Sequence, residues 1–313
     1  MSDELPDDLR PVADFFGMVG TAPVRKDFHV VRAIRAIAAI DAAPFTLVFG
    51  GGTALARAHK LVRRMSEDLD FKIVPQPSAP VSRNGLRREL GKLGDKVTQA
   101  QQDAGFVFDP TDKENPRSRN ENRYTLWQLP YDSADTAALG LRPTIQIELT
   151  YSLLRLPPVT LPISSFIAEA YDWPPEIPAL ACVSVTQTAA EKLVALTRRT
   201  AMEMAGLSRD IDPALIRHVY DLHMMRTHID PDKAAVLARE IAQTDANEFR
   251  NQYPAYASDL AGETRKALDA LRTDPTHARR YADFVAAMVY GEQTEFGVAM
   301  KTVADMVDVA WPA

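Results

Sequence analysis

The sequence predicts an α/β (α+β) protein in which a half that mixes strands and helices is followed by a helical C-terminal half. Two observations support this prediction. Short apolar or alternating runs, typical of strands, are separated by helical patterns up to about residue 180. From about residue 186 to the end, the apolar residues recur almost entirely at helical spacing. We therefore expect a mixed sheet flanked by helices in residues 1–183 and a helical domain in residues 184–313.

The N-terminal half begins with a helical pattern over 24–43, which we expect to end before Pro44. The apolar run 45–49 predicts a buried strand that leads into a run of glycines. A helix over 53–61 is expected next, with Thr53 near its N-cap. The later elements are a strand over 69–74, a charged helix over 83–104, strands over 122–131 and 143–151, and an edge strand that tolerates prolines over 156–163.

The C-terminal half shows helical patterns in consecutive segments, namely 186–205, 212–228, 230–244, 258–272 and 276–291.

The single cysteine, Cys182, excludes an internal disulfide framework and is typical of a reducing cytoplasm. The N-terminus lacks the pattern of a signal peptide, and no run approaches the roughly 20 apolar residues of a membrane span. We expect a cytoplasmic protein without a membrane partner. The net charge of −6 argues against a general nucleic-acid coat protein but leaves room for a local basic surface.

The stretch "FGGGTALARAHKLVRRMSEDLDF" (49–71) carries the strongest chemical signal. A strand that ends in glycines and opens a helix presents backbone N–H groups, which suit a phosphate. Asp68 and Asp70 are separated by one residue in the next strand, so both side chains leave the same face. Two carboxylates on one face can hold Mg²⁺ ions that also bind the phosphates of a nucleotide.

A third acid is expected from a neighbouring strand, and Glu148 in "IQIELTY" is the candidate. Its neighbours Ile147 and Leu149 fall on the opposite, apolar face of that strand. Taken singly, a G-G-T is usually a turn and a D-x-D is usually a solvated loop. The order strand, glycines, helix and strand favours a nucleotide site instead.

These residues resemble a known family. "GGTAL" followed by "RRMSEDLDF" looks like motif I of the nucleotidyltransferase superfamily and, more narrowly, the AbiEii/AbiGii nucleotidyltransferase toxins, which include the MenT type. The R-x-S-x-D-x-D-F form of that family is matched at Arg64, Ser66, Asp68, Asp70 and Phe71. "AAEKLVALTRR" (189–199) resembles the lysine motif of the family, and "IRHVYDLHMM" (216–225) resembles its R-D-x-x-D-L motif, with His218 in place of the first acid.

The resemblance implies a nucleotidyltransferase-type sheet and a Mg²⁺-dependent enzyme that uses a nucleoside triphosphate (NTP). It implies nucleotide binding by Gly51, Gly52, Thr53, Arg64, Ser66 and Lys192. It also implies metal binding by Asp68, Asp70 and Glu148, with Glu148 as a candidate base. Lys192 and Asp221 are implied as further catalytic residues, Lys192 on the triphosphate and Asp221 orienting the lysine or the nucleotide. The helical domain would then complete the active site and contact the substrate.

Each of these residues has a structural alternative. Lys192 would be an exposed helix lysine, as most lysines are, and Asp221 a surface acid paired with Arg217. Arg64 would pair with Asp68 and hold the loop. Ser66 would cap the loop through the backbone, although the resemblance makes it a site that an antitoxin can modify.

Cations cluster in three places, which are listed here with two nearby aromatic residues: Arg57, His59, Lys60, Arg63 and Arg64; Arg83, Arg87, Arg88 and Lys92; and Arg117, Arg119 and Arg123 beside Tyr124 and Trp127. Such clusters suit RNA phosphates and unpaired bases, although each is also typical of a solvated face. With the resemblance, they favour the tRNA 3′ acceptor end as substrate for a toxin of a toxin–antitoxin or abortive-infection (phage-defence) system. The alternatives are a protein or small-molecule acceptor, and a nucleotide-binding regulatory module. We expect a cognate antitoxin and favour a monomer.

Overall fold

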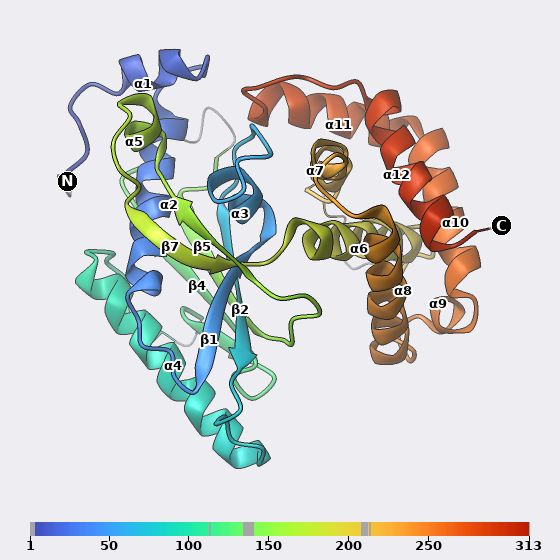
Figure 1. Cartoon of the computed structure of the whole chain (residues 1–313), viewed down its shortest axis with the longest axis horizontal. Coiled ribbons are helices and arrows are strands. Elements are labelled where there is room, and N and C mark those ends of the chain that lie inside the picture. Colours follow the sequence, from blue (N-terminus) through green and yellow to red (C-terminus); the bar gives the residue numbers. More distant parts are fainter. Residues whose placement is uncertain (1–3, 113, 134–140, 208–211, 213, 313) are drawn as a thin grey trace. The chain divides into compact units, whose positions relative to one another are not determined.

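The computed structural model of the chain describes residues 4–112, 114–133, 141–207, 212 and 214–312 (Figure 1). The chain divides into two compact units, Met1–Val183 and Ser184–Ala313. The first unit is built on one sheet with helices beside it, and the described elements of the second unit are helices. The mixed α/β fold class predicted from the sequence is confirmed.

The sheet of the first unit has seven strands in the order β3-β4-β5-β2-β1-β7-β6. Two neighbouring pairs, β2 with β5 and β1 with β7, are parallel, and the other pairs are antiparallel. The strands are β1 (Phe45–Gly50), β2 (Asp68–Pro75), β3 (Arg117–Arg119), β4 (Tyr124–Pro130), β5 (Thr144–Tyr151), β6 (Val159–Ile163) and β7 (Ile177–Cys182). The proline-bearing strand β6 lies at an edge, as its sequence predicts.

The core of the first unit lies on one face of this sheet. Helices α2 (Ala22–Ala38) and α4 (Arg83–Asp103) contribute one side of it, for example through Ile34 and Leu90. The strands contribute the other side through alternate residues such as Leu69 and Ile147, because side chains of a strand alternate between faces. Figure 1 shows both helices running along the sheet. The remaining helices of this unit are α1 (Arg10–Phe15), α3 (Gly51–Arg57) and α5 (Phe166–Ala170).

Several boundaries differ from the sequence prediction. Helix α2 begins and ends earlier than 24–43, with Pro23 in its first turn, where a missing N–H is tolerated. Helix α3 begins at Gly51, so Thr53 lies inside it and is not its N-cap. The sequence analysis missed β3 and β7. Strand β3 is a short polar edge strand, "RSR", with no apolar alternation to reveal it.

The second unit consists of α6 (Val185–Met204), α7 (Arg217–Met225), α8 (Pro231–Glu248), α9 (Pro254–Ser258), α10 (Leu260–Thr273), α11 (Pro275–Met288) and α12 (Phe296–Ala310). Helix α6 packs against α7, α8 and α10, and α12 packs against α7 and α8. Helix α7 is shorter than the pattern over 212–228 predicts, and Pro213 of that pattern lies outside the described residues. No described helix combines the length and the hydropathy that a membrane span requires.

Candidate functional site

The register of two strands brings the predicted acids together on one face of the sheet. Strand β2 runs parallel to β5, with Asp68 opposite Gln146 and Asp70 opposite Glu148. Paired residues project to the same side, so Asp68, Asp70 and Glu148 share one face. All three side chains are half-buried, whereas the intervening Leu69 is fully buried in the core on the other face. We call the face of the sheet that carries Asp68, Asp70 and Glu148 the acidic face.

The turn between β1 and α3 lies against the Asp70 carboxylate. Gly51 adopts a φ of +70°, a left-handed conformation that side chains disfavour. A Cβ atom added to Gly51 would lie 1.8 Å from Oδ2 of Asp70. Both observations require glycine at this position, and they place the backbone of the turn in close approach to the acidic face.

Gly51→Ala is expected to lower the free energy of unfolding by roughly 2 kcal/mol or more, because the methyl group combines backbone strain with a clash. Urea unfolding of the two proteins measures the difference. Gly94→Ala is the matched control, because Gly94 lies within α4. A Cβ atom there would lie 4.0 Å from Cζ2 of Trp127, which is an ordinary contact. Alanine there should be neutral or stabilising. Equal stability of Gly51→Ala and the unmutated protein would contradict the argument.

The next glycine brings two further predicted residues to the turn. A Cβ atom on Gly52 would lie 2.5 Å from Nη2 of Arg64 and 2.9 Å from Oγ of Ser66. Arg64 is buried and donates through Nη1 to the backbone oxygen of Met65 at 2.9 Å. Thr53 is also at the turn, but its hydroxyl donates to the backbone oxygen of Asp68 at 2.6 Å. Its side chain therefore joins α3 to the start of β2.

Asp68 forms an ion pair with a residue that the sequence analysis missed. Nη1 of Arg142 lies 2.6 Å from Oδ1 of Asp68 and also donates to Oε1 of Gln146. The backbone of Arg142 is held as well, because its N–H donates to Oε2 of Glu67 at 2.8 Å. Its carbonyl oxygen accepts from Nζ of Lys26 at 2.8 Å. Arg142 is thus fixed by both its backbone and its side chain at the acidic face.

A buried ion pair between Lys26 and Glu67 holds the backbone of Arg142. Lys26 and Glu67 are 0% and 3% exposed, and Nζ of Lys26 donates to Oε2 of Glu67. Burial lowers the pKa of Lys26, and the negative charge of Glu67 opposes that shift. Because Glu67 directly precedes Asp68 in the chain, the pair links helix α2 to the start of the acidic strand.

Glu148 is held by the hydroxyl of Tyr124 on β4. Burial, followed by the charge of Glu148 and its hydrogen bond with Tyr124, raises the pKa of Tyr124 to about 12. The tyrosine therefore remains a hydrogen-bond donor near neutral pH. The sequence analysis offered Tyr124 and Trp127 as stacking residues for bases. That role is wrong for Trp127, which is 0% exposed and donates to Oγ1 of Thr98 at 2.9 Å.

The lysine and aspartate motifs come together within the second unit. Nζ of Lys192 on α6 lies 2.9 Å from Oδ2 of Asp221 on α7 and 3.2 Å from Nδ1 of His218. Lys192 is buried and Asp221 is 0% exposed. The structural alternatives, an exposed lysine and a surface acid, are therefore wrong. The guanidinium of Arg217 lies over the ring of Phe284, 6.0 Å from its centroid.

The cation clusters are partly neutralised by acids. Arg57 is buried between Asp27 at 3.5 Å and Glu169 at 3.6 Å, and so is not part of a basic surface. Arg83 pairs with Glu121, and both Arg88 and Lys92 pair with Glu89. Around α4, a shallow hollow of about 470 Å³ is lined by Arg87, Arg88, Lys92, Asn84, Gly91, Asp95 and Asn122. This hollow keeps a net positive lining.

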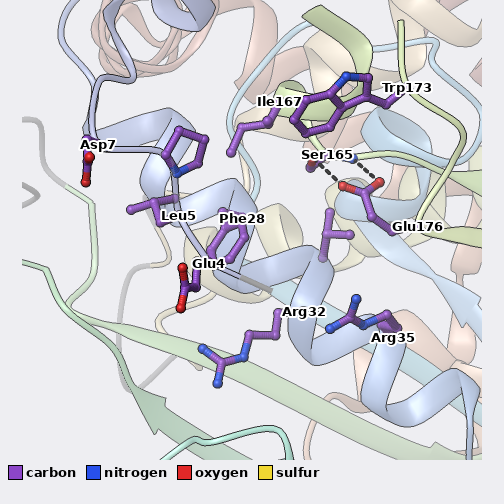
Figure 2. A pocket seen from close by; sticks show the side chains of 12 residues that line it. Glu4, Leu5, Asp7, Phe28, Arg32, Arg35, Ser165, Ile167, Trp173 and Glu176 are labelled. Atoms are coloured by element: carbon purple, nitrogen blue, oxygen red, sulfur yellow. Dashed lines mark hydrogen bonds between the residues drawn. The ribbon is translucent and has the colours of Figure 1, made fainter. Parts of the chain in front are cut away.

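A separate pocket of about 340 Å³ lies beside α2 and is shown in Figure 2. Phe28, Arg32 and Arg35 line it from one face of α2, and the segment from Glu4 to Asp7 lies at its edge. Oγ of Ser165 donates to Glu176 at 2.5 Å within it. None of its described lining residues belongs to the predicted nucleotide or metal set.

A family model described as the nucleotidyl transferase AbiEii toxin of a type IV toxin–antitoxin system matches residues 32–308. The chain belongs to the AbiEii nucleotidyltransferase toxin family. Its fold is similar to that of MenT4, a nucleotidyltransferase toxin from Mycobacterium tuberculosis H37Rv, with a TM-score of 0.53 and 15% identity. That match covers 98% of this chain and 91% of MenT4. No curated protein matches the chain in sequence.

The AbiEii acids have the chemistry that a divalent cation requires, because carboxylate oxygens are hard ligands. Asp68, Asp70 and Glu148 supply them from one face of the sheet. However, no group of three or more His, Cys, Asp or Glu side chains among the described residues is gathered closely enough to hold a metal ion. The carboxylate donors suit Mg²⁺ in chemistry, and Oδ1 of Asp68 is paired with Arg142.

Proposed function

We propose that the protein transfers a nucleotide from an NTP to RNA, namely the 3′ acceptor end of tRNA, and thereby blocks translation. The reaction would be Mg²⁺-dependent and of the EC 2.7.7 type. The observation that carries this proposal is the register that places Asp68, Asp70 and Glu148 on one face beside the Gly51 turn. Family membership supports nucleotidyl transfer by a toxin.

In the proposed reaction, a hydroxyl of the acceptor attacks the α-phosphorus of the NTP and pyrophosphate leaves. A new ester bond forms as the bond between the α- and β-phosphates breaks. Glu148 would accept the proton of the attacking hydroxyl, oriented by its hydrogen bond with Tyr124. When bound, the divalent cation would neutralise negative charge on the phosphates.

The phosphates would be bound at the turn by the backbone N–H groups of Gly51, Gly52 and Thr53, where the two glycines allow Asp70 and Arg64 to approach the backbone closely. Arg64 and Ser66 lie beside Gly52 and would contact the same phosphates. We further propose that Lys192 acts on the triphosphate and that Asp221 orients it, which their 2.9 Å ion pair supports.

RNA is proposed as acceptor because exposed cations gather around α4 and β3, and a chain of phosphates is attracted by such a surface. NTPs and tRNA also make the cytoplasm the expected compartment. The family suggests a cognate antitoxin, and Ser66 is a proposed target of modification. A phosphate on Ser66, beside Arg64 and the glycine turn, would repel an incoming triphosphate. Growth arrest by this toxin would serve abortive infection, that is, phage defence.

The test is incubation of the purified protein with total tRNA, Mg²⁺ and each α-labelled NTP in turn. We expect label on tRNA with the unmutated protein and none with Asp68→Ala or Lys192→Ala. Label on a protein or small molecule instead would overturn the tRNA proposal and support the second acceptor class. Nucleotide binding without transfer to any acceptor would support a regulatory module.

A further inference from the structure

Arg142 is held at the acidic face with unusual completeness for a partly exposed arginine. Its side chain is 41% exposed, yet its guanidinium contacts both Asp68 and Gln146. Its backbone is hydrogen-bonded on both sides by the buried pair of Lys26 and Glu67. The fold thus places one positive charge on an acid that the proposed reaction needs for a cation.

Arg142 occupies one oxygen of Asp68, and its positive charge repels a cation that binds at that same oxygen. Nη1 of Arg142 lies 2.6 Å from Oδ1, which is the position of a ligand to that oxygen. A divalent cation that binds Asp68 through Oδ1 would therefore displace the guanidinium. The backbone bonds of Arg142 keep its Cα in place, so the displaced side chain remains within reach of the same face.

We propose that Arg142 exchanges partners, binding Asp68 in the absence of a divalent cation and a phosphate oxygen of the nucleotide once the cation occupies Asp68. This inference rests on the proposed function and deepens it. A guanidinium presents planar donors that suit a phosphate as well as a carboxylate. Arg142 is thus a binding residue of the nucleotide site that the motif pattern does not include.

The exchange makes opposite predictions for two ligands of one variant, Arg142→Gln. Without its competitor, Asp68 should bind Mn²⁺ alone about 3- to 10-fold more tightly, as expected for a partly exposed pair. In saturating Mn²⁺, however, CTP and ATP should bind about 10-fold more weakly, because a charged contact to phosphate is lost. Mn²⁺ binding is measured by electron paramagnetic resonance and nucleotide binding by isothermal titration calorimetry, without any acceptor.

Arg10→Gln is the matched control, because it removes one positive charge from an exposed pair with Asp8 at the start of α1, outside the proposed nucleotide and RNA sites. It should change neither affinity. Arg142→Lys keeps the charge but loses the planar fork, and intermediate values are expected for both ligands. Unfolding curves of the variants check that the fold is kept, since the backbone bonds of Arg142 do not depend on its side chain.

Failure of this inference is distinguishable from failure of the proposed function. If the unmutated protein binds both Mn²⁺ and a nucleotide but Arg142→Gln matches it for either ligand, the exchange is wrong and the proposed function stands. If the unmutated protein binds neither ligand, both are wrong. Tighter Mn²⁺ binding together with weaker nucleotide binding in Arg142→Gln alone supports the exchange.

Discussion

Asp70→Asn is expected to reduce nucleotide transfer by about 10³-fold or more while leaving the fold intact. Asp70 lies at the centre of the acidic face, opposite Glu148 in the sheet and directly against the Gly51 turn. Asparagine has nearly the same shape, so the close approach at Gly51 is kept. The change removes the negative charge that a cation on this face requires.

The rate of label transfer from NTP to tRNA measures this loss, and growth after induced expression gives an independent readout. The unmutated protein should arrest growth and Asp70→Asn should not. Asp308→Asn, the same change at an exposed position of α12, should behave as the unmutated protein does. Full transfer activity in Asp70→Asn would remove the acidic face from the reaction.

Lys26→Met is expected to lower the free energy of unfolding by about 3–5 kcal/mol, which is the typical effect of removing one partner from a buried ion pair. Glu67 is 3% exposed and would be left as a buried charge without its lysine. The backbone oxygen of Arg142 would also lose its buried donor. Urea unfolding followed by fluorescence measures the change, with Trp127 and Trp173 reporting from the first unit.

A second substitution separates the charge from the packing. In Lys26→Met/Glu67→Gln the buried charge is gone, yet glutamine can still accept from the N–H of Arg142. We expect this double variant to be more stable than Lys26→Met alone. Lys92→Met, which breaks an exposed pair with Glu89, should leave the midpoint unchanged. A Lys26→Met protein as stable as the unmutated one would refute the supporting role of the pair.

Local patterns were sufficient to predict the elements that carry the acids. Alternation predicted β2 and β5, and the one-residue spacing of Asp68 and Asp70 predicted their common face. The sequence does not show that these two strands are neighbours in the sheet. Only the structure therefore brings Glu148 beside Asp70. The family resemblance, rather than periodicity, indicated Lys192 and Asp221.

The residues that support the acids could not be predicted in the same way. Arg142 lies 74 positions from Asp68 in the chain, and Lys26 lies 116 positions from Arg142. No local pattern relates such residues, and lysine is ordinarily a surface residue. Trp127 was wrongly predicted to stack on bases, because an aromatic residue among cations is typical of a binding surface. It is instead buried in the core.

The buried lysine also bears on where this protein can be cut. The family match begins at residue 32, so Lys26 lies outside the matched segment, although its amine pairs with Glu67, which directly precedes Asp68. A fragment trimmed to 32–308 would keep every motif residue but lose Lys26, the buried partner of Glu67. Removal of the N-terminal residues would therefore disturb strand β2, although none of the removed residues belongs to a motif.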